Sequence, residues 1–125
     1  MIEINEVIII HKILIDKFGG SHGIRDQALL ESAINRPYST FDGQELYQTP
    51  EEKSSAIIES ILINHPFIDG NKRIGYALMR LTLMNYGKDI EAFEDEKYEF
   101  VINIANGKFK YKDILNWITK RLKIK

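Results

Sequence analysis

A chain of 125 residues is the size of one domain, and its net charge of −1 creates no overall field that would favour nucleic acid or a membrane surface. The composition is 44% hydrophobic, enough for a buried core, and the absence of cysteine excludes disulfides and cysteine–zinc sites. The first residues lack the basic flank of a signal peptide, and no apolar run reaches the roughly 18 residues of a membrane span. We therefore expect a single domain over residues 1–125, located in the cytoplasm.

Hydrophobic periodicity predicts an all-α protein of about six helices. The expected ranges, in chain order, are residues 5–17, 27–35, 50–64, 71–86, 95–105 and 112–122. The first three should begin at the capping residues Asn5, Asp26 and Thr49, and Glu52 completes a capping box for the third. The fourth is apolar nearly all round, so it is expected to be the buried central helix.

Residues 38–48 are the least helical part of the chain. Asp42-Gly43, placed between aromatic residues, can form the turn of a hairpin. On the residues alone, a connecting loop is an equal alternative.

The last two expected helices carry apolar residues at helical spacing. In the fifth, the stripe expected to face inward is Tyr98, Val101, Ile102 and Ala105. In the sixth, the expected inward residues are Ile114, Leu115, Ile118 and Leu122. Trp117 is expected at the edge of the core. His11, inside the first helix, is interpreted as a structural histidine rather than a ligand.

The most informative stretch is residues 65–73, with the sequence His-Pro-Phe-Ile-Asp-Gly-Asn-Lys-Arg, between the third and fourth helices. Gly70 permits a tight turn, and Asn71 can cap the following helix. The free N–H groups and the dipole at that helix start attract an anion. Two cations, Lys72 and Arg73, stand in its first turn, where they suit a bound polyphosphate.

Two further residues of this stretch suit phosphate chemistry. Asp69 offers the hard oxygen that Mg²⁺ takes alongside substrate phosphates. His65 can accept a hydroxyl proton near neutral pH. The alternative is a polar inter-helix turn with a cap. Phosphate chemistry is favoured, because six useful residue types fall within nine positions.

The stretch resembles the motif of the Fic/Doc family, in the variant of the Doc-type toxins. General Fic proteins carry Gly after the motif Asn and a further Arg beyond the first; here Lys72 and Tyr76 stand at those positions. Lys after the Asn, with Asp69 before Gly70, is the Doc-type pattern. Other similar segments are Phe18-Gly19-Gly20, Gly23-Ile24-Arg25-Asp26, Leu30-Glu31-Ser32-Ala33, Arg36-Pro37 and Asn64-His65-Pro66-Phe67.

The resemblance implies a Fic fold in which residues 38–48 form a hairpin flap that pairs with an extended segment of the target protein. It also implies a toxin with kinase activity, which moves the γ-phosphate of ATP to a threonine of elongation factor Tu and so blocks translation. The implied cofactors are ATP and Mg²⁺.

In that reaction His65 would accept the proton of the attacking hydroxyl, and Asp69 would hold Mg²⁺. Lys72 and Arg73 would neutralise the developing phosphate charge. The residues of the implied nucleotide cradle are Gly70, Asn71, Lys72 and Arg73. Phe67 is expected to anchor the loop in the core.

Two alternatives stay open: a Fic-type AMP transferase, which the residues at 72 and 76 disfavour, and a catalytically idle peptide-binding module, which the intact His65 and Asp69 disfavour. Many Fic proteins carry an inhibitory [ST]xxxE[GN] helix, but the nearest match here ends in Glu59-Ser60. The resemblance therefore implies inhibition in trans by a Phd-type antitoxin, whose C-terminal segment folds as a helix in a groove. Direct contact with nucleic acid or a membrane is not expected.

Overall fold

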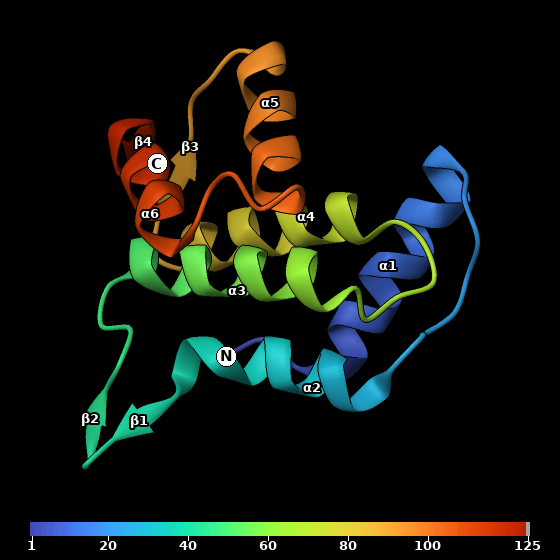
Figure 1. Ribbon diagram of the computed structural model, residues 1–125, viewed down its shortest axis with the longest axis horizontal. Coiled ribbons are helices and arrows are strands. Elements are labelled where there is room, and N and C mark those ends of the chain that lie inside the picture. The colour runs from blue at the N-terminus through green and yellow to red at the C-terminus, as the bar shows by residue number, and fades with distance from the viewer. Residues whose placement is uncertain (125) are drawn as a thin grey trace.

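The computed structural model describes residues 1–124, which form six α-helices and two small antiparallel strand pairs (Figure 1). The helices are α1 (Ile4–Phe18), α2 (Gln27–Asn35), α3 (Pro50–Asn64), α4 (Asn71–Met84), α5 (Glu94–Ala105) and α6 (Tyr111–Lys120). A 3₁₀ turn, η1 (Arg36–Tyr38), precedes strands β1 (Thr40–Phe41) and β2 (Gln44–Glu45), and the second pair is β3 (Lys88–Ile90) with β4 (Leu122–Ile124). The predicted all-α class is confirmed. Among residues 1–124, every helix is too short or too polar to cross a membrane.

The central helix is α3, not α4 as predicted. Every residue of α3 from Lys53 to Leu62 is buried, and Figure 1 shows it running beside α4 with α2 on its other side. In α4 the cations and Met84 are exposed or half-exposed, so this helix is buried on one side only. The two helices approach closely at Gly75, where a Cβ atom would lie 3.3 Å from Ile61.

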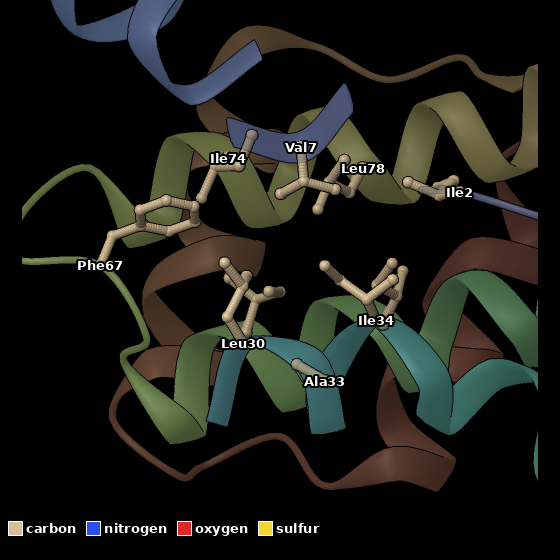
Figure 2. Close-up of a cluster of buried hydrophobic side chains, with 10 residues drawn as sticks. Ile2, Val7, Leu30, Ala33, Ile34, Phe67, Ile74 and Leu78 are labelled. Atoms are coloured by element: carbon tan, nitrogen blue, oxygen red, sulfur yellow. The ribbon is translucent and has the colours of Figure 1, made fainter. Parts of the chain in front are cut away.

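Two hydrophobic clusters flank the α3–α4 pair. The first joins it to α1 and α2 (Figure 2) and consists of Ile2, Val7, Leu30, Ala33, Ile34, Ile57, Ile61, Phe67, Ile74 and Leu78. The second, toward α5 and α6, consists of Ile58, Leu62, Met79, Leu83, Ile90, Phe100, Ile104, Ile114, Trp117 and Ile118. Phe67 belongs to the loop between α3 and α4, so its burial anchors that loop in the core, as expected. Full burial of a Phe side chain contributes about 1.5–3 kcal/mol.

The helix starts are partly as predicted. Asp26 accepts a hydrogen bond from the N–H of Leu29 (3.0 Å), and Thr49 exchanges two with Glu52 (3.1 Å each). Asn5, however, does not cap α1. The helix begins one residue earlier, and Glu6 accepts from the backbone N–H of Glu3 (3.2 Å).

The C-terminal third differs from the prediction in which side chains are buried. The core residues of α5 are Phe100 and Ile104, whereas Tyr98 is 70% exposed. Trp117 is buried and stacks on Phe100, with ring centroids 3.8 Å apart, rather than lying at the edge. Periodicity identified both helices, but α5 carries apolar residues on two faces, so the pattern alone could not select the inner one.

The end of the described chain is a strand rather than the last turn of a helix. α6 stops at Lys120, and β4 pairs antiparallel with β3 in the register Lys88↔Ile124, Asp89↔Lys123 and Ile90↔Leu122. A hydrogen bond from the N–H of Glu91 to the carbonyl of Arg121 (2.8 Å) extends this pairing. The pairing joins segments more than thirty residues apart, which local periodicity does not report.

The predicted hairpin is present at β1 and β2. Asp42 (φ 53°) and Gly43 (φ 77°) both have positive φ, as a tight two-residue hairpin turn requires. The hairpin precedes α3, whereas His65 follows it, so the two lie at opposite ends of the helix (Figure 1). With 15 residues, α3 is about 22 Å long.

Candidate functional site

The motif of residues 65–73 forms a tight connection between two antiparallel helices. His65 ends α3 in the left-handed region (φ 47°, ψ 58°), and its N–H donates to the carbonyl of Ile61. Gly70, also left-handed (φ 76°), begins α4. A residue with a Cβ atom adopts the left-handed region at a cost, so the conformation of His65 must be held by its surroundings.

The loop between α1 and α2 provides those surroundings. Ile24 pairs with Phe67 in an isolated antiparallel bridge, and the N–H of Ile68 donates to the carbonyl of Gly23 (3.0 Å). The N–H groups of Arg25 and of the residue after it both donate to the carbonyl of Pro66 (2.7 and 3.1 Å). The motif is thus bound to a segment about forty residues earlier in the chain.

The Arg25 side chain makes two more contacts with the motif backbone. Its Nε donates to the carbonyl of His65 and its Nη2 to the carbonyl of Asn64, both at 2.6 Å. These carbonyls belong to the last turn of α3, which has no intrahelical partners for them. Arg25 therefore positions His65. Sequence reasoning offers Arg25 only as a candidate contact behind the site residues and leaves it out of the predicted site, although its segment is one of those that resemble the family.

Asn71 does not cap α4 as predicted. Its side chain accepts from the N–H of Phe67 (3.0 Å) and donates to the carbonyl of Phe67 (2.9 Å), so it closes the loop instead. Asn71 is the first residue inside the helix, and the capping position belongs to Gly70, which has no side chain to offer. The N-terminus of α4 consequently has no side-chain cap and no acidic residue in its first turn. Such an end is suited to an anion.

The Asp69 carboxylate is fixed by two backbone donors. Its Oδ2 accepts from the N–H of Ser21 (3.1 Å) and its Oδ1 from the N–H of Gly70 (2.8 Å). These hydrogen bonds hold the pKa of Asp69 below its usual range, so the exposed carboxylate is ionised at neutral pH. A Cβ atom at Gly20 would lie 2.8 Å from Oδ2 of Asp69, so a residue larger than glycine at position 20 would displace the carboxylate.

His11 is structural, as interpreted from the sequence. It is buried, its ring stacks on Phe67 with centroids 3.8 Å apart, and its Nε2 donates to the carbonyl of Asp69 (2.7 Å). A Cβ atom at Gly70 would lie 3.4 Å from the same Nε2 and 3.0 Å from Ile15. Helix α1 thus contacts the motif through His11 and Ile15 but contributes no residue to the lining of the cleft described next.

A cleft of about 720 Å³ brings all the predicted site residues together. Its lining is His65, Ile68, Asp69, Gly70, Asn71, Lys72, Arg73 and Tyr76, with Glu94, Lys97, Tyr98, Val101 and Ile102 of α5. Within residues 1–124, neither the His65 ring nor the Lys72 ammonium has a hydrogen-bond or ion-pair partner. The Arg73 guanidinium lies 4.5 Å from the ring centroid of Phe18. None of the lining residues comes from the hairpin.

Tyr76 was singled out in the sequence only as a departure from the Fic pattern. Its hydroxyl is buried and, in the part of the chain that the structure describes, has no hydrogen-bond partner. Burial raises the pKa of Tyr76 to about 12, so the hydroxyl stays protonated and can donate a hydrogen bond.

The residues of the cleft fit a magnesium-bound nucleotide. Each oxygen of the Asp69 carboxylate accepts one backbone hydrogen bond and retains a lone pair on an exposed atom. Mg²⁺ in nucleotide sites typically takes one or two carboxylates and completes its coordination with phosphates and water. Over residues 1–124, no group of three His, Cys, Asp or Glu side chains is placed to hold a metal ion without such help.

Comparisons with known proteins agree with this geometry. A model described as the Fic/DOC family matches residues 1–83 of the 125 in this chain. Over 87 residues the chain is 34% identical to a protein named Toxin Doc from Mycolicibacterium smegmatis, a match that covers 69% of this chain and 67% of that protein. The family-model match includes α1, the α1–α2 loop and the whole of the motif. The chain therefore belongs to the Fic/DOC family.

Proposed function

We propose that this chain is the toxin of a toxin–antitoxin system and that it acts as a protein kinase, transferring the γ-phosphate of ATP to a threonine of elongation factor Tu. One observation carries the proposal. The cleft combines an imidazole that has no partner among residues 1–124, an ionised carboxylate, two cations and a helix start without a side-chain cap. The name Toxin Doc of a 34% identical relative supports the toxin role.

In the proposed phosphoryl transfer, each residue of the cleft has a separate role. His65 accepts the proton of the threonine hydroxyl, whose oxygen forms a bond to the γ-phosphorus while the bond to the β–γ bridging oxygen breaks and ADP leaves. The N-terminus of α4 and Lys72 bind phosphate oxygens, and with Arg73 they stabilise the charge of the transition state. Asp69 would hold Mg²⁺, which when bound offsets phosphate charge. Arg25 acts on the reaction only through the position of His65.

The same geometry supports regulation by a second protein. Glu59 lies in the nearest match to the inhibitory Fic helix, but it is buried in α3 and paired with Arg36 (2.9 Å). It therefore has no route to the cleft. Since an unrestrained kinase of a translation factor is harmful, the proposal includes a Phd-type antitoxin as the inhibitor, bound through a helix that folds in a groove of the toxin.

The chemistry is tested by following two labels. The purified chain is incubated with elongation factor Tu, Mg²⁺ and ATP labelled either at the γ-phosphate or in the adenine, with the His65→Ala variant as control. Transfer of the γ-label alone, lost in the variant, supports the kinase. Transfer of the adenine label would instead identify an AMP transferase, and transfer of neither label to this factor would refute the proposed reaction.

The regulation is tested in cells. Expression of the chain alone should arrest growth, and co-expression with the neighbouring small open reading frame should restore it. If the chain alone is harmless while the purified enzyme modifies its target, and no neighbour-encoded peptide binds it, the antitoxin part of the proposal is wrong.

A further inference from the structure

The Arg73 side chain is held at the cleft by an aromatic ring rather than by hydrogen bonds. Its guanidinium carbon lies 4.5 Å from the centroid of the Phe18 ring, at the C-terminal end of α1. Among residues 1–124, this guanidinium makes no hydrogen bond and no ion pair. A guanidinium carries five N–H donors, and the contact with Phe18 engages no hydrogen-bond acceptor. All five donors of Arg73 are therefore available to an anion in the cleft.

The Phe18 ring is not part of the hydrophobic core. It is 55% exposed and belongs to neither of the two hydrophobic clusters described above. Two cations lie over it, Arg73 and the preceding residue Lys17, whose Nζ is 5.4 Å from the ring centroid. Of these two cations, Arg73 lines the cleft and Lys17 does not. The contact of Phe18 that bears on the cleft is thus the one with Arg73.

The segment that follows Phe18 reaches the other charged group at this end of the cleft. A Cβ atom at Gly20 would lie 2.8 Å from the Asp69 carboxylate, and the N–H of Ser21 donates to the same carboxylate (3.1 Å). Four consecutive residues therefore contact both Arg73 and Asp69. Because α1 packs against α4 (Figure 1), the end of α1 is held in place beside the start of α4.

We propose that Phe18 is a positioning residue for Arg73, and that its ring holds the guanidinium in place for the phosphate groups of the substrate. The inference rests on the proposed function, because that function assigns phosphate binding to this end of the cleft. An arginine suits this arrangement, since it stacks on aromatic rings and binds phosphate through its N–H donors. A long side chain loses conformational freedom when it binds a ligand, so a ring that restricts Arg73 beforehand lowers that cost.

The test measures binding of Mg²⁺–tripolyphosphate by calorimetry, which does not depend on catalysis. Phe18→Leu keeps an apolar side chain but removes the aromatic face, so binding should weaken about two- to fivefold, the size of one exposed cation–π contact. Phe18→Tyr and Phe18→Trp keep the face and should bind as the parent chain does. The rate of γ-label transfer at saturating ATP should fall in Phe18→Leu by a similar factor, with no change in KM for the protein target.

Two control variants separate this contact from general effects. Lys17→Ala removes the other cation at the same ring, and Phe93→Leu makes the same exchange at an aromatic residue that is 79% exposed and outside the cleft. Both should bind tripolyphosphate as the parent chain does. Thermal melts check that every variant folds. In an Arg73→Ala background, Phe18→Leu should weaken binding no further, because its partner is already absent.

Three results would overturn the inference. The first is unchanged binding in Phe18→Leu. The second is a loss of the same size in the Arg73→Ala background, because the ring would then act without Arg73. The third is a loss in Phe18→Tyr or Phe18→Trp as large as in Phe18→Leu. The proposed function fails separately: the expected binding results in a chain that transfers no γ-label would support the role of Phe18 and refute the kinase.

Discussion

Substitutions of His65 should change activity and stability independently, and the structure allows the size of each effect to be estimated. The imidazole is exposed and has no hydrogen-bond partner within residues 1–124, so His65→Ala removes no packing and no polar contact. The backbone is the sensitive part, because φ 47° costs any residue with a Cβ atom about 1–2 kcal/mol. The His65→Ala variant has the same unfavourable backbone free energy at this position as the parent, whereas glycine adopts this conformation without that cost.

Both variants should lose about 10²–10⁴-fold in γ-phosphate transfer, the range for removal of a general base. Their stabilities should differ, with His65→Gly unfolding about 4 °C above His65→Ala if about 1 kcal/mol of strain is released. Circular dichroism melts and a γ-label transfer assay measure the two effects. His22→Ala is the control, because His22 is an exposed histidine of the α1–α2 loop that lies outside the large cleft. Near-normal turnover by a folded His65→Ala protein would exclude His65 as the base, and a Gly variant less stable than the Ala variant would refute the strain argument.

Three further substitutions test the remaining parts of the site. Asp69→Asn keeps the size of the side chain but removes its charge, so the Mg²⁺ titration of activity should move to higher concentration; an identical titration would place the metal elsewhere. Lys72→Gly should lose γ-phosphate transfer, and an unchanged rate would make Lys72 a solvated cation of the first turn. Arg25→Ala removes both hydrogen bonds to the end of α3 and should lower kcat with little change in KM for ATP, at a cost of about 1 kcal/mol in stability, while Arg25→Lys restores part of the loss. If Arg25→Ala has the same stability and activity as the parent chain, the Arg25 side chain is not needed to position the motif.

Much of the helical layout could be predicted because its signals are local. Asp26 and Thr49 begin α2 and α3 through contacts only three residues away, and the turn at Asp42-Gly43 lies within four residues. The failures have a common cause. The core face of α5, the burial of Trp117 and the pairing of β4 with β3 depend on elements that are distant in the chain.

The candidate site shows the same division. The residue types between 65 and 73 indicated phosphate chemistry because each has an intrinsic property: a titratable ring, a carboxylate, a cation, a flexible backbone. Their arrangement comes from elsewhere. Asn71 closes the loop because Gly70 takes the capping position, and neither role could be assigned until the boundary of α4 was known. Helix boundaries are the least reliable part of a sequence-based prediction.

The α1–α2 loop shows why a motif alone is insufficient for this site. Ser21 fixes the Asp69 carboxylate across 48 positions of the chain, and Arg25 fixes the backbone of His65 across 40. The proposed base and the proposed metal ligand are therefore oriented by one short loop, which has its own left-handed glycines at Gly20 and Gly23. A Cβ atom at Gly23 would lie 2.8 Å from Ile68, so this loop has to stay small where it meets the motif. Motif and loop constrain each other, and a change that displaces the loop is expected to disturb His65 and Asp69 together.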